Sequence, residues 1–366
     1  MPPVDVAVLL IGVIAIALAL VDVFQSVIVP RAPTLNFLYR LSAVVIRGLW
    51  KLWPGLAHVL NARDPESREN FFATFAPLAL VIMLGVWVAV LILGYGAILW
   101  TLRAQITPFP HSYWDTVYFA GSSLLTIGFG DIVARHGVAR FISLCAGVSG
   151  LGVVSITTAY LFAVFGTFQQ RETFIVTLAA RAGSPPSGVG LLEFGLTTNT
   201  HESFPIVMRE AQRWIASLME SHLAYPILAY FRSSHDDQSW VATLGLLLDA
   251  SSLATTVLDP PKLGEAAVSS LIGRHAVHDL SGYFRLQGEI ADPGLGRDEF
   301  DRAYDRLESV GYSLRDRDTA WRDFAELRGE YAGPLNAMAR FFQIPPIQWI
   351  GDRSLLALHP HATQNP

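Results

Sequence analysis

Residues 122–131 read Ser-Ser-Leu-Leu-Thr-Ile-Gly-Phe-Gly-Asp and lie between two apolar segments, 71–102 and 141–170, that carry no charged side chain. Each segment is long enough to cross the roughly 30 Å hydrocarbon core of a bilayer. Gly128 and Gly130 tolerate positive φ without steric cost, so dihedrals of alternating handedness can point successive carbonyl groups the same way. Four copies of such a loop around one axis would form rings of carbonyl oxygens that replace the hydration shell of a cation.

The stretch from Thr126 to Gly130, Thr-Ile-Gly-Phe-Gly, resembles the selectivity filter of tetrameric potassium channels. The resemblance implies that carbonyl oxygens of this stretch hold potassium ions, with the Thr126 hydroxyl as the innermost ligand. Asp131 follows directly and is expected to concentrate cations at the outer mouth. The expected filter therefore covers 126–131. Its expected potassium-binding residues are Thr126, Ile127, Gly128 and Phe129, and Gly130 completes the conducting stretch.

Three residues depart from the pattern that is common in that family. Leu125 stands where many members have Thr, Phe129 where many have Tyr, and Ser122 where some have a carboxylate. Phe129 lacks the hydroxyl that can form a hydrogen bond behind the filter. The carbonyl ligands are kept, but these departures leave a weakly selective cation channel open as an alternative.

The residues around the filter predict the rest of a pore module. Ser112 and Asp115 have the spacing of a capping box, which predicts a pore helix over 113–125. The negative end of its dipole would then favour a cation in a central cavity. An inner helix is expected over 138–170, with Gly150 as either a hinge or a site of close helix packing. Three residues that follow at helical spacing are expected to line the cavity and gate: Leu151, Val154 and Thr158.

The predicted fold class is an all-α membrane protein. The chain has 366 residues, of which 52% are hydrophobic and only 16% charged, and this is too apolar for one soluble domain. Besides the outer helix over 71–102 and the inner helix, residues 1–30 predict an additional N-terminal transmembrane helix. Asp22 interrupts that helix in its last third. A structural ion pair with Arg31 is the favoured interpretation, although an acid inside a span is also a functional candidate.

Basic residues between the first two spans predict the orientation of the chain. They place segment 31–70 in the cytoplasm of a multi-pass protein of the plasma (inner) membrane, with the N-terminus outside and the C-terminus cytoplasmic. Within that segment, 36–60 is predicted to be an amphipathic helix at the membrane interface, or else a soluble helix packed on the cytoplasmic region. The basic residues are Arg31, Arg40, Arg47, Lys51, Arg63 and Arg68.

Residues 172–366 contain more acidic than basic side chains. A stretch with Gly and Pro predicts a linker over 172–190, and helical periodicity predicts an α-helical cytoplasmic domain over 191–366. The sequence contains no glycine-rich nucleotide-binding motif, and His275 and His278 are interpreted as surface residues rather than as part of a metal site. Helices are expected at 206–225, 239–258, 265–290, 298–311, 319–331 and 334–342.

Together these features predict passive, potassium-selective conduction through a homotetramer, because one chain supplies one pore loop. The expected partners are three identical subunits and membrane lipids. No nucleic acid, no cofactor beyond the permeant potassium ions and no enzymatic activity are expected. The cytoplasmic domain is expected to modulate the pore through a ligand or partner that the sequence does not name. A membrane receptor or scaffold that keeps the pore fold for assembly is the other alternative.

Overall fold

The computed structural model describes residues 2–29, 41–60, 64–182, 186–197, 203–233, 238–262, 264–286, 295–344 and 350. The chain divides into two compact units, Met1–Gly166 and Thr167–Pro366. The division falls inside one long helix, α6 (Gly137–Ala182), which contributes to both. The protein is an all-α membrane protein. Within the described residues, three helical stretches are long and apolar enough to cross a membrane: Pro3–Ile28, Glu66–Thr101 and Gly137–Ala182.

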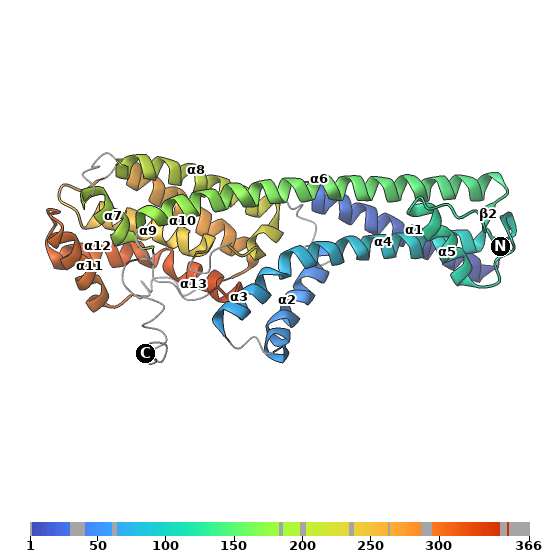
Figure 1. The fold of residues 1–366 in the computed structure, drawn as a ribbon, viewed down its shortest axis with the longest axis horizontal. Helices are drawn as coiled ribbons and strands as arrows, with labels where there is room; N and C mark the ends of the chain where they lie inside the picture. Colours follow the sequence, from blue (N-terminus) through green and yellow to red (C-terminus); the bar gives the residue numbers. More distant parts are fainter. Residues whose placement is uncertain are drawn as a thin grey trace. The chain divides into compact units, whose positions relative to one another are not determined.

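The first unit is built on two helices that are apolar on all sides. Helix α1 (Pro3–Val23) continues into a π-helical turn, η1 (Phe24–Ile28), and packs lengthwise against α4 (Phe75–Thr101), as Figure 1 shows. A Cβ added to Gly12 would lie 2.7 Å from the Gly94 carbonyl oxygen. The two backbones therefore approach closely at this crossing, which is a common use of small residues between membrane helices.

Two shorter helices, α2 (Leu41–Val59) and α3 (Pro65–Ala73), join these spans. Helix α2 occupies most of the predicted amphipathic segment 36–60, whose first five residues lie outside the described part of the chain. The predicted outer helix 71–102 is divided, because α3 ends at Ala73 and α4 begins at Phe75. The hydroxyl of Thr74, between them, donates a hydrogen bond to the Phe71 carbonyl oxygen at 2.7 Å.

The segment after α4 forms a loop that is closed at its base. A 3-10 turn, η3 (Arg103–Gln105), leads to strand β1 (Ile106–Thr107), which pairs antiparallel with β2 (Val133–Ala134). Between the strands lie α5 (Tyr113–Leu124) and the predicted filter. The core of the unit is formed by side chains of α1, α4, α5 and the first part of α6, including Ala19, Val23, Met83, Trp87, Leu91, Tyr95, Leu99, Phe119, Leu124, Ala146 and Val153.

The end of α6 corrects two boundaries predicted from the sequence. The inner helix was expected to end at 170 and a linker to cover 172–190, but α6 continues to Ala182 and α7 (Gly188–Thr197) follows. Ile175, Leu178 and Ala182 are buried, so packing of this apolar stripe in the second unit stabilises the helical conformation. Residues 183–185 of the predicted linker lie outside the described part of the chain.

The second unit is a group of helices around one central helix. All but one of the residues of α9 are buried, and α7, α8, α10, α12 and α13 pack against it. A helix buried on all sides carries apolar residues all round, as α9 does. Besides the end of α6 and α7, the unit contains α8 (Ser203–Ala224), η4 (Pro226–Tyr230), α9 (Trp240–Thr256), α10 (Gly264–Phe284), α11 (Arg297–Ser309), α12 (Arg317–Gly329) and α13 (Ala332–Phe341).

A buried ion pair joins α9 to α12. The Arg328 guanidinium donates to the two Asp249 carboxylate oxygens at 3.0 and 3.2 Å, and both side chains are almost completely buried. The Tyr331 hydroxyl donates to the same carboxylate at 2.5 Å. Burial and the neighbouring Asp249 charge raise the pKa of Tyr331 well above its ordinary value, so this hydroxyl keeps its proton.

We predict that Asp249→Ala destabilises the second unit by about 3–5 kcal/mol, because the Arg328 charge is left buried without a partner. Limited proteolysis of the purified full-length protein measures this effect as faster cleavage within residues 203–344. The control is Asp298→Ala, which breaks an exposed pair with Arg302 and is expected to cost less than about 1 kcal/mol. Equal cleavage rates for the two variants would contradict the prediction.

Candidate functional site

Gln105 fixes the base of the pore loop. Its carbonyl oxygen accepts a hydrogen bond from the Arg135 N–H at 2.8 Å, which extends the β1–β2 pairing. Its side-chain oxygen accepts from the Ala139 N–H at 3.1 Å, in the first turn of α6, where N–H groups have no partner within the helix. One residue at the end of the outer helix thus holds the start of the inner helix.

The pore helix α5 begins with the predicted capping box, which is confirmed. The Asp115 N–H donates to the Ser112 hydroxyl at 3.3 Å, and the Ser112 N–H donates to the Asp115 carboxylate at 2.9 Å. The Tyr113 hydroxyl donates to the Leu93 carbonyl oxygen at 2.8 Å and so ties α5 to α4. The helix ends at Leu124, directly before the filter.

The backbone of the predicted filter alternates in handedness. Thr126, Gly128 and Gly130 have φ values of 56°, 65° and 81°, whereas Ile127 and Phe129 between them do not lie in this region. This is the alternation that would turn successive carbonyl groups the same way. Positive φ is strained for a β-branched residue such as Thr126, and strained backbone of this kind is typical of functional sites. The Ile127 N–H donates to the Ser122 carbonyl oxygen at 2.9 Å, which ties the filter to the end of α5.

Two side chains of the predicted filter are exposed within the single chain. Ile127 and Phe129 are 52% and 64% exposed within the single chain. The Phe129 ring stacks on the Tyr118 ring of α5, with centroids 6.1 Å apart and planes at 5°. The Tyr118 hydroxyl also interacts with Asp131. Sequence reasoning identified the hydroxyl that Phe129 lacks, but it missed that Tyr118 brings one to the neighbouring carboxylate.

Gly150 lies where the inner helix meets the pore helix. A Cβ at this position would lie 1.9 Å from the Leu124 carbonyl oxygen, at the C-terminal end of α5. Of the two interpretations of this glycine, close packing explains the geometry, and α6 is unbroken here. The Tyr95 hydroxyl, from α4, shares a hydrogen bond of 2.7 Å with the Ser149 hydroxyl and so fixes the same turn of α6.

The three predicted cavity residues lie on one side of α6. Leu151, Val154 and Thr158 are all exposed within the single chain. The Thr158 hydroxyl donates to the Val154 carbonyl oxygen at 2.8 Å, so both residues lie on adjacent turns of one face. Their role in a cavity stays a prediction.

Asp22 takes part in a buried hydrogen-bond cluster that sequence reasoning did not find. Its carboxylate accepts from the Trp87 indole N–H at 2.7 Å, from the Ser42 N–H at 3.1 Å and from the Ser42 hydroxyl at 3.0 Å. The predicted partner, Arg31, lies outside the described residues. The cluster joins α1, α2 and α4, so the intramembrane acid has a structural function.

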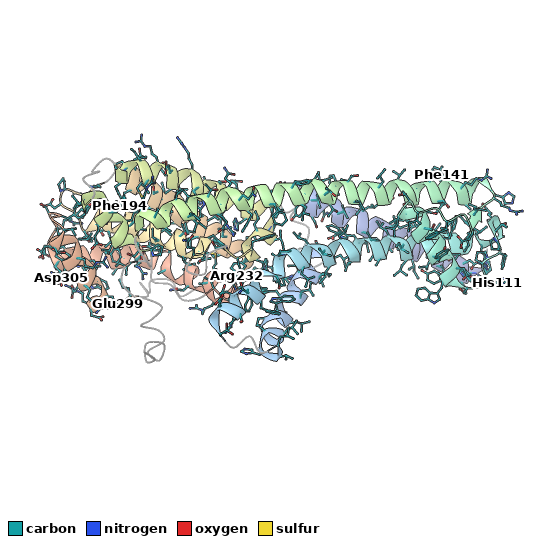
Figure 2. The ribbon with its side chains drawn as sticks, viewed as in Figure 1. His111, Phe141, Phe194, Arg232, Glu299 and Asp305 are labelled. Carbon is teal, nitrogen blue, oxygen red and sulfur yellow. The ribbon has the colours of Figure 1, made fainter. Side chains whose placement is uncertain are left out.

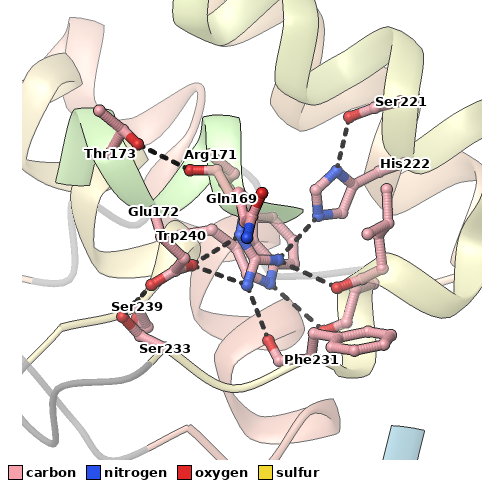
Figure 3. A network of polar contacts seen from close by, with 12 residues as sticks. Gln169, Arg171, Glu172, Thr173, Ser221, His222, Phe231, Ser233, Ser239 and Trp240 are labelled. Carbon is pink, nitrogen blue, oxygen red and sulfur yellow. Dashed lines mark hydrogen bonds and ion pairs between the residues drawn. The ribbon is translucent and has the colours of Figure 1, made fainter. Parts of the chain in front are cut away.

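Arg171 forms a second buried cluster, in the unit that begins at Thr167 (Figure 3). Its guanidinium donates to the carbonyl oxygens of Leu228 and Phe231, both at 3.0 Å, and to the Glu172 carboxylate at 2.9 Å. These carbonyl oxygens lie in and directly after η4, at the end of a short helix, where a cation is favourable. The signal in the sequence is the Arg-Glu pair that ends a long uncharged segment.

His222 completes the Arg171 cluster as a neutral ring. Burial, and then the adjacent Arg171 charge, hold the pKa of His222 well below its ordinary value. The Nδ1 atom lies 2.8 Å from the Leu218 carbonyl oxygen and therefore donates, which leaves Nε2 to accept from the Arg171 guanidinium at 3.4 Å. As pH falls below about 6.5, an unfolded chain binds a proton here that the folded chain does not, so the stability of the unit decreases.

The described residues contain no group of three or more His, Cys, Asp or Glu side chains placed to hold a metal ion. His275 and His278 are exposed and both face Asp279, at 3.4 and 3.3 Å.

Comparison with known proteins matches the pore region. Residues 86–167 match the model of a family described as "Ion channel", from the middle of α4 to the first residue of the second unit. This match supports an ion channel as the function of this part of the chain. The uncharacterized membrane protein YdjJ of Bacillus subtilis (strain 168) is 21% identical over 206 residues, which cover 55% of this chain and 58% of that protein. The chain thus spans little more than half of that relative. No solved structure matches.

We predict that Gly150→Ala lowers the free energy of unfolding of the pore module by about 1–3 kcal/mol, because the new methyl group overlaps the Leu124 backbone. The matched control is Gly152→Ala on the same helix, where a Cβ would meet nothing within 4 Å. Thermal unfolding of both variants, purified in detergent, measures the difference. Equal melting temperatures would show that α6 does not pack on α5 in this way.

Proposed function

We propose that the chain is the subunit of a homotetrameric, potassium-selective ion channel that conducts passively, and that its second unit modulates the pore. The match of residues 86–167 to the ion channel family supports ion conduction. The backbone of the predicted filter supports the proposed selectivity for potassium and the proposed tetramer. Three residues at positive φ, Thr126, Gly128 and Gly130, alternate with two that are not, as a row of carbonyl ligands on one side of a strand requires.

The chemistry assigned to each filter residue follows from this backbone. Carbonyl oxygens of Thr126, Ile127, Gly128 and Phe129 replace the water around a potassium ion, and the Thr126 hydroxyl adds the innermost ring. Asp131 raises the cation concentration at the outer mouth. Because the binding groups are backbone atoms of a loop tied to α5, they are arranged before the ion arrives, and no cofactor or enzymatic step is needed.

The exposed apolar side chains support assembly around an axis. A single loop offers one carbonyl per level, so a complete ring needs three further identical subunits. Ile127, Phe129 and Trp114 are exposed apolar side chains on the pore loop, and Phe141, on the outer side of α6 in Figure 2, is 64% exposed. Neighbouring subunits and lipid would cover these surfaces, and Leu151, Val154 and Thr158 would then line the cavity.

The orientation follows from charge. Arg47, Lys51 and Arg68, in the described part of the segment between the first two spans, favour the cytoplasmic side of the plasma (inner) membrane. The N-terminus and the filter then face outward, and the second unit is cytoplasmic.

A weakly selective cation channel is the second candidate, and two residues favour it. Leu125 and Phe129 each replace a hydroxyl-bearing side chain of many potassium channels, although the Tyr118 hydroxyl interacts with Asp131. The two candidates share the conduction pathway and differ in the preference for potassium over sodium. A receptor or scaffold that does not conduct would lack the pathway altogether.

We predict that Gly128→Ala abolishes potassium flux into liposomes that contain the purified protein, because a Cβ is strained at a φ of 65°. Gly85→Ala in α4 is the control, since a Cβ there meets nothing within 4 Å, and it should conduct like the original chain. Both must show the same oligomer in detergent. Unchanged flux in Gly128→Ala would remove the filter assignment, and no flux in either variant or in the original chain would favour the scaffold.

We also predict that Arg171→Gln changes the open probability while the ion preference stays the same. The variant leaves the Leu228 and Phe231 carbonyl groups without their charged donor, so the end of α6 is held less firmly in the second unit. Its open probability should move toward that of a chain that ends at Ala182. Arg181→Gln, which breaks an exposed pair with Glu210 on the same helix, is the control. Equal open probabilities in both variants and the original chain would contradict modulation through Arg171.

A further inference from the structure

Helix α2 has one face that is buried against aromatic side chains. Trp50 lies 4.7 Å from Phe75, and Trp53 stacks on Phe71 with ring centroids 4.8 Å apart. Ala57, one turn further on, is buried as well. These contacts attach α2 to α3 and to the first turn of α4, so the position of α2 bears on the start of the outer pore helix.

The opposite face of α2 is apolar and uncovered. Leu52 and Val59 are 71% and 77% exposed. They share a face, since they lie seven residues, or about two turns, apart. A continuous apolar stripe along a helix marks a surface for a partner or a membrane. The other members of this stripe are Val44 and Leu56.

Positive charge follows one edge of this stripe. Arg47 and Lys51 are four residues apart and therefore neighbours along the helix. The nineteen residues of α2, all of them described, include no Asp or Glu. An apolar face with a basic edge and no acidic residue is the pattern of a helix that lies in the interface of an anionic bilayer.

The first turn of α2 is held against two candidate membrane spans. The Ser42 N–H and hydroxyl both donate to Asp22 of α1, and the Trp87 indole of α4 donates to the same carboxylate. A carboxylate at the first turn of a helix is favoured by the helix dipole. Because α1 and α4 both belong to candidate spans, this contact keeps the start of α2 beside the membrane-spanning helices.

We infer that α2 docks on an anionic phospholipid surface, with Leu52 and Val59 among the upper acyl chains and Arg47 and Lys51 on lipid phosphate groups. The lipid is recognised by its negative headgroup and by its apolar chain together. The inference does not depend on which ion crosses the pore. Lipid docking can therefore fail while the proposed channel function holds, and the proposed channel function can fail while lipid docking holds.

Depth-dependent quenching in liposomes tests this surface. The full-length chain has one cysteine, Cys145, so Cys145→Ser provides a background for one fluorescent label at Leu52→Cys or at Val59→Cys. The control label is at Asp298→Cys, a side chain 74% exposed in the second unit. Doxyl-labelled phosphatidylglycerol and doxyl-labelled phosphatidylcholine are the quenchers, and iodide is the aqueous quencher.

The lipid quenchers should act on labels at 52 and 59 at least roughly threefold more strongly than on the label at 298, and iodide should show the reverse order. Phosphatidylglycerol should quench more strongly than phosphatidylcholine. This preference should fall roughly fivefold for each charge removed in Arg47→Gln and Lys51→Gln. Iodide quenching at 52 equal to that at 298, or shielding at 52 from both kinds of quencher, would overturn docking on lipid. Equal quenching by the two lipids would overturn anionic recognition.

Discussion

The pore depends on one constraint: a backbone that is to bind a cation must hold alternating dihedrals that an unsupported chain does not keep. Thr126 and Gly128 adopt positive φ, and the conformation is strained at Thr126. The support comes from hydrogen bonds to the end of α5 and from the ring stack of Phe129 on Tyr118. The support is anchored further out, because Gly150 lets α6 lie against the last carbonyl group of α5. The strained backbone of the predicted filter is therefore supported by α5, which packs on α6, and the contacts of Gln105 fix the start of α6.

Local sequence rules predicted the parts of the pore that depend on local chemistry. The Ser112–Asp115 capping box needs only a spacing of three residues, and glycine favours a left-handed backbone, so both features could be predicted from the sequence. The apolar spans could be predicted because the thickness of the bilayer sets their length. The positive φ values of Gly128 and Gly130 can also be predicted from the sequence, because glycine tolerates them. The positive φ of Thr126 cannot be predicted in this way, because the surrounding contacts impose it on a β-branched residue.

The misses share a physical reason. Arg171 and Glu172 end an uncharged segment, and charge after a span normally indicates a boundary with water. The structure instead buries both side chains. Arg171 donates to the carbonyl oxygens of Leu228 and Phe231, and Glu172 accepts from the Ser233 hydroxyl, so the partners lie more than fifty residues further along the chain. The Trp87 and Ser42 donors to Asp22 were not predicted either, and the interpreted partner, Arg31, lies outside the described residues. Pairing over such separations depends on tertiary packing, which a single sequence does not reveal.

Selective conduction is the central claim, and the reversal potential of the purified full-length protein in planar bilayers tests it most directly. With potassium on one side and sodium on the other, a filter of four carbonyl rings should give currents that reverse close to the potassium equilibrium potential, far from zero. A reversal potential near zero would contradict potassium selectivity and favour a weakly selective cation pore. No current under any condition would contradict conduction itself.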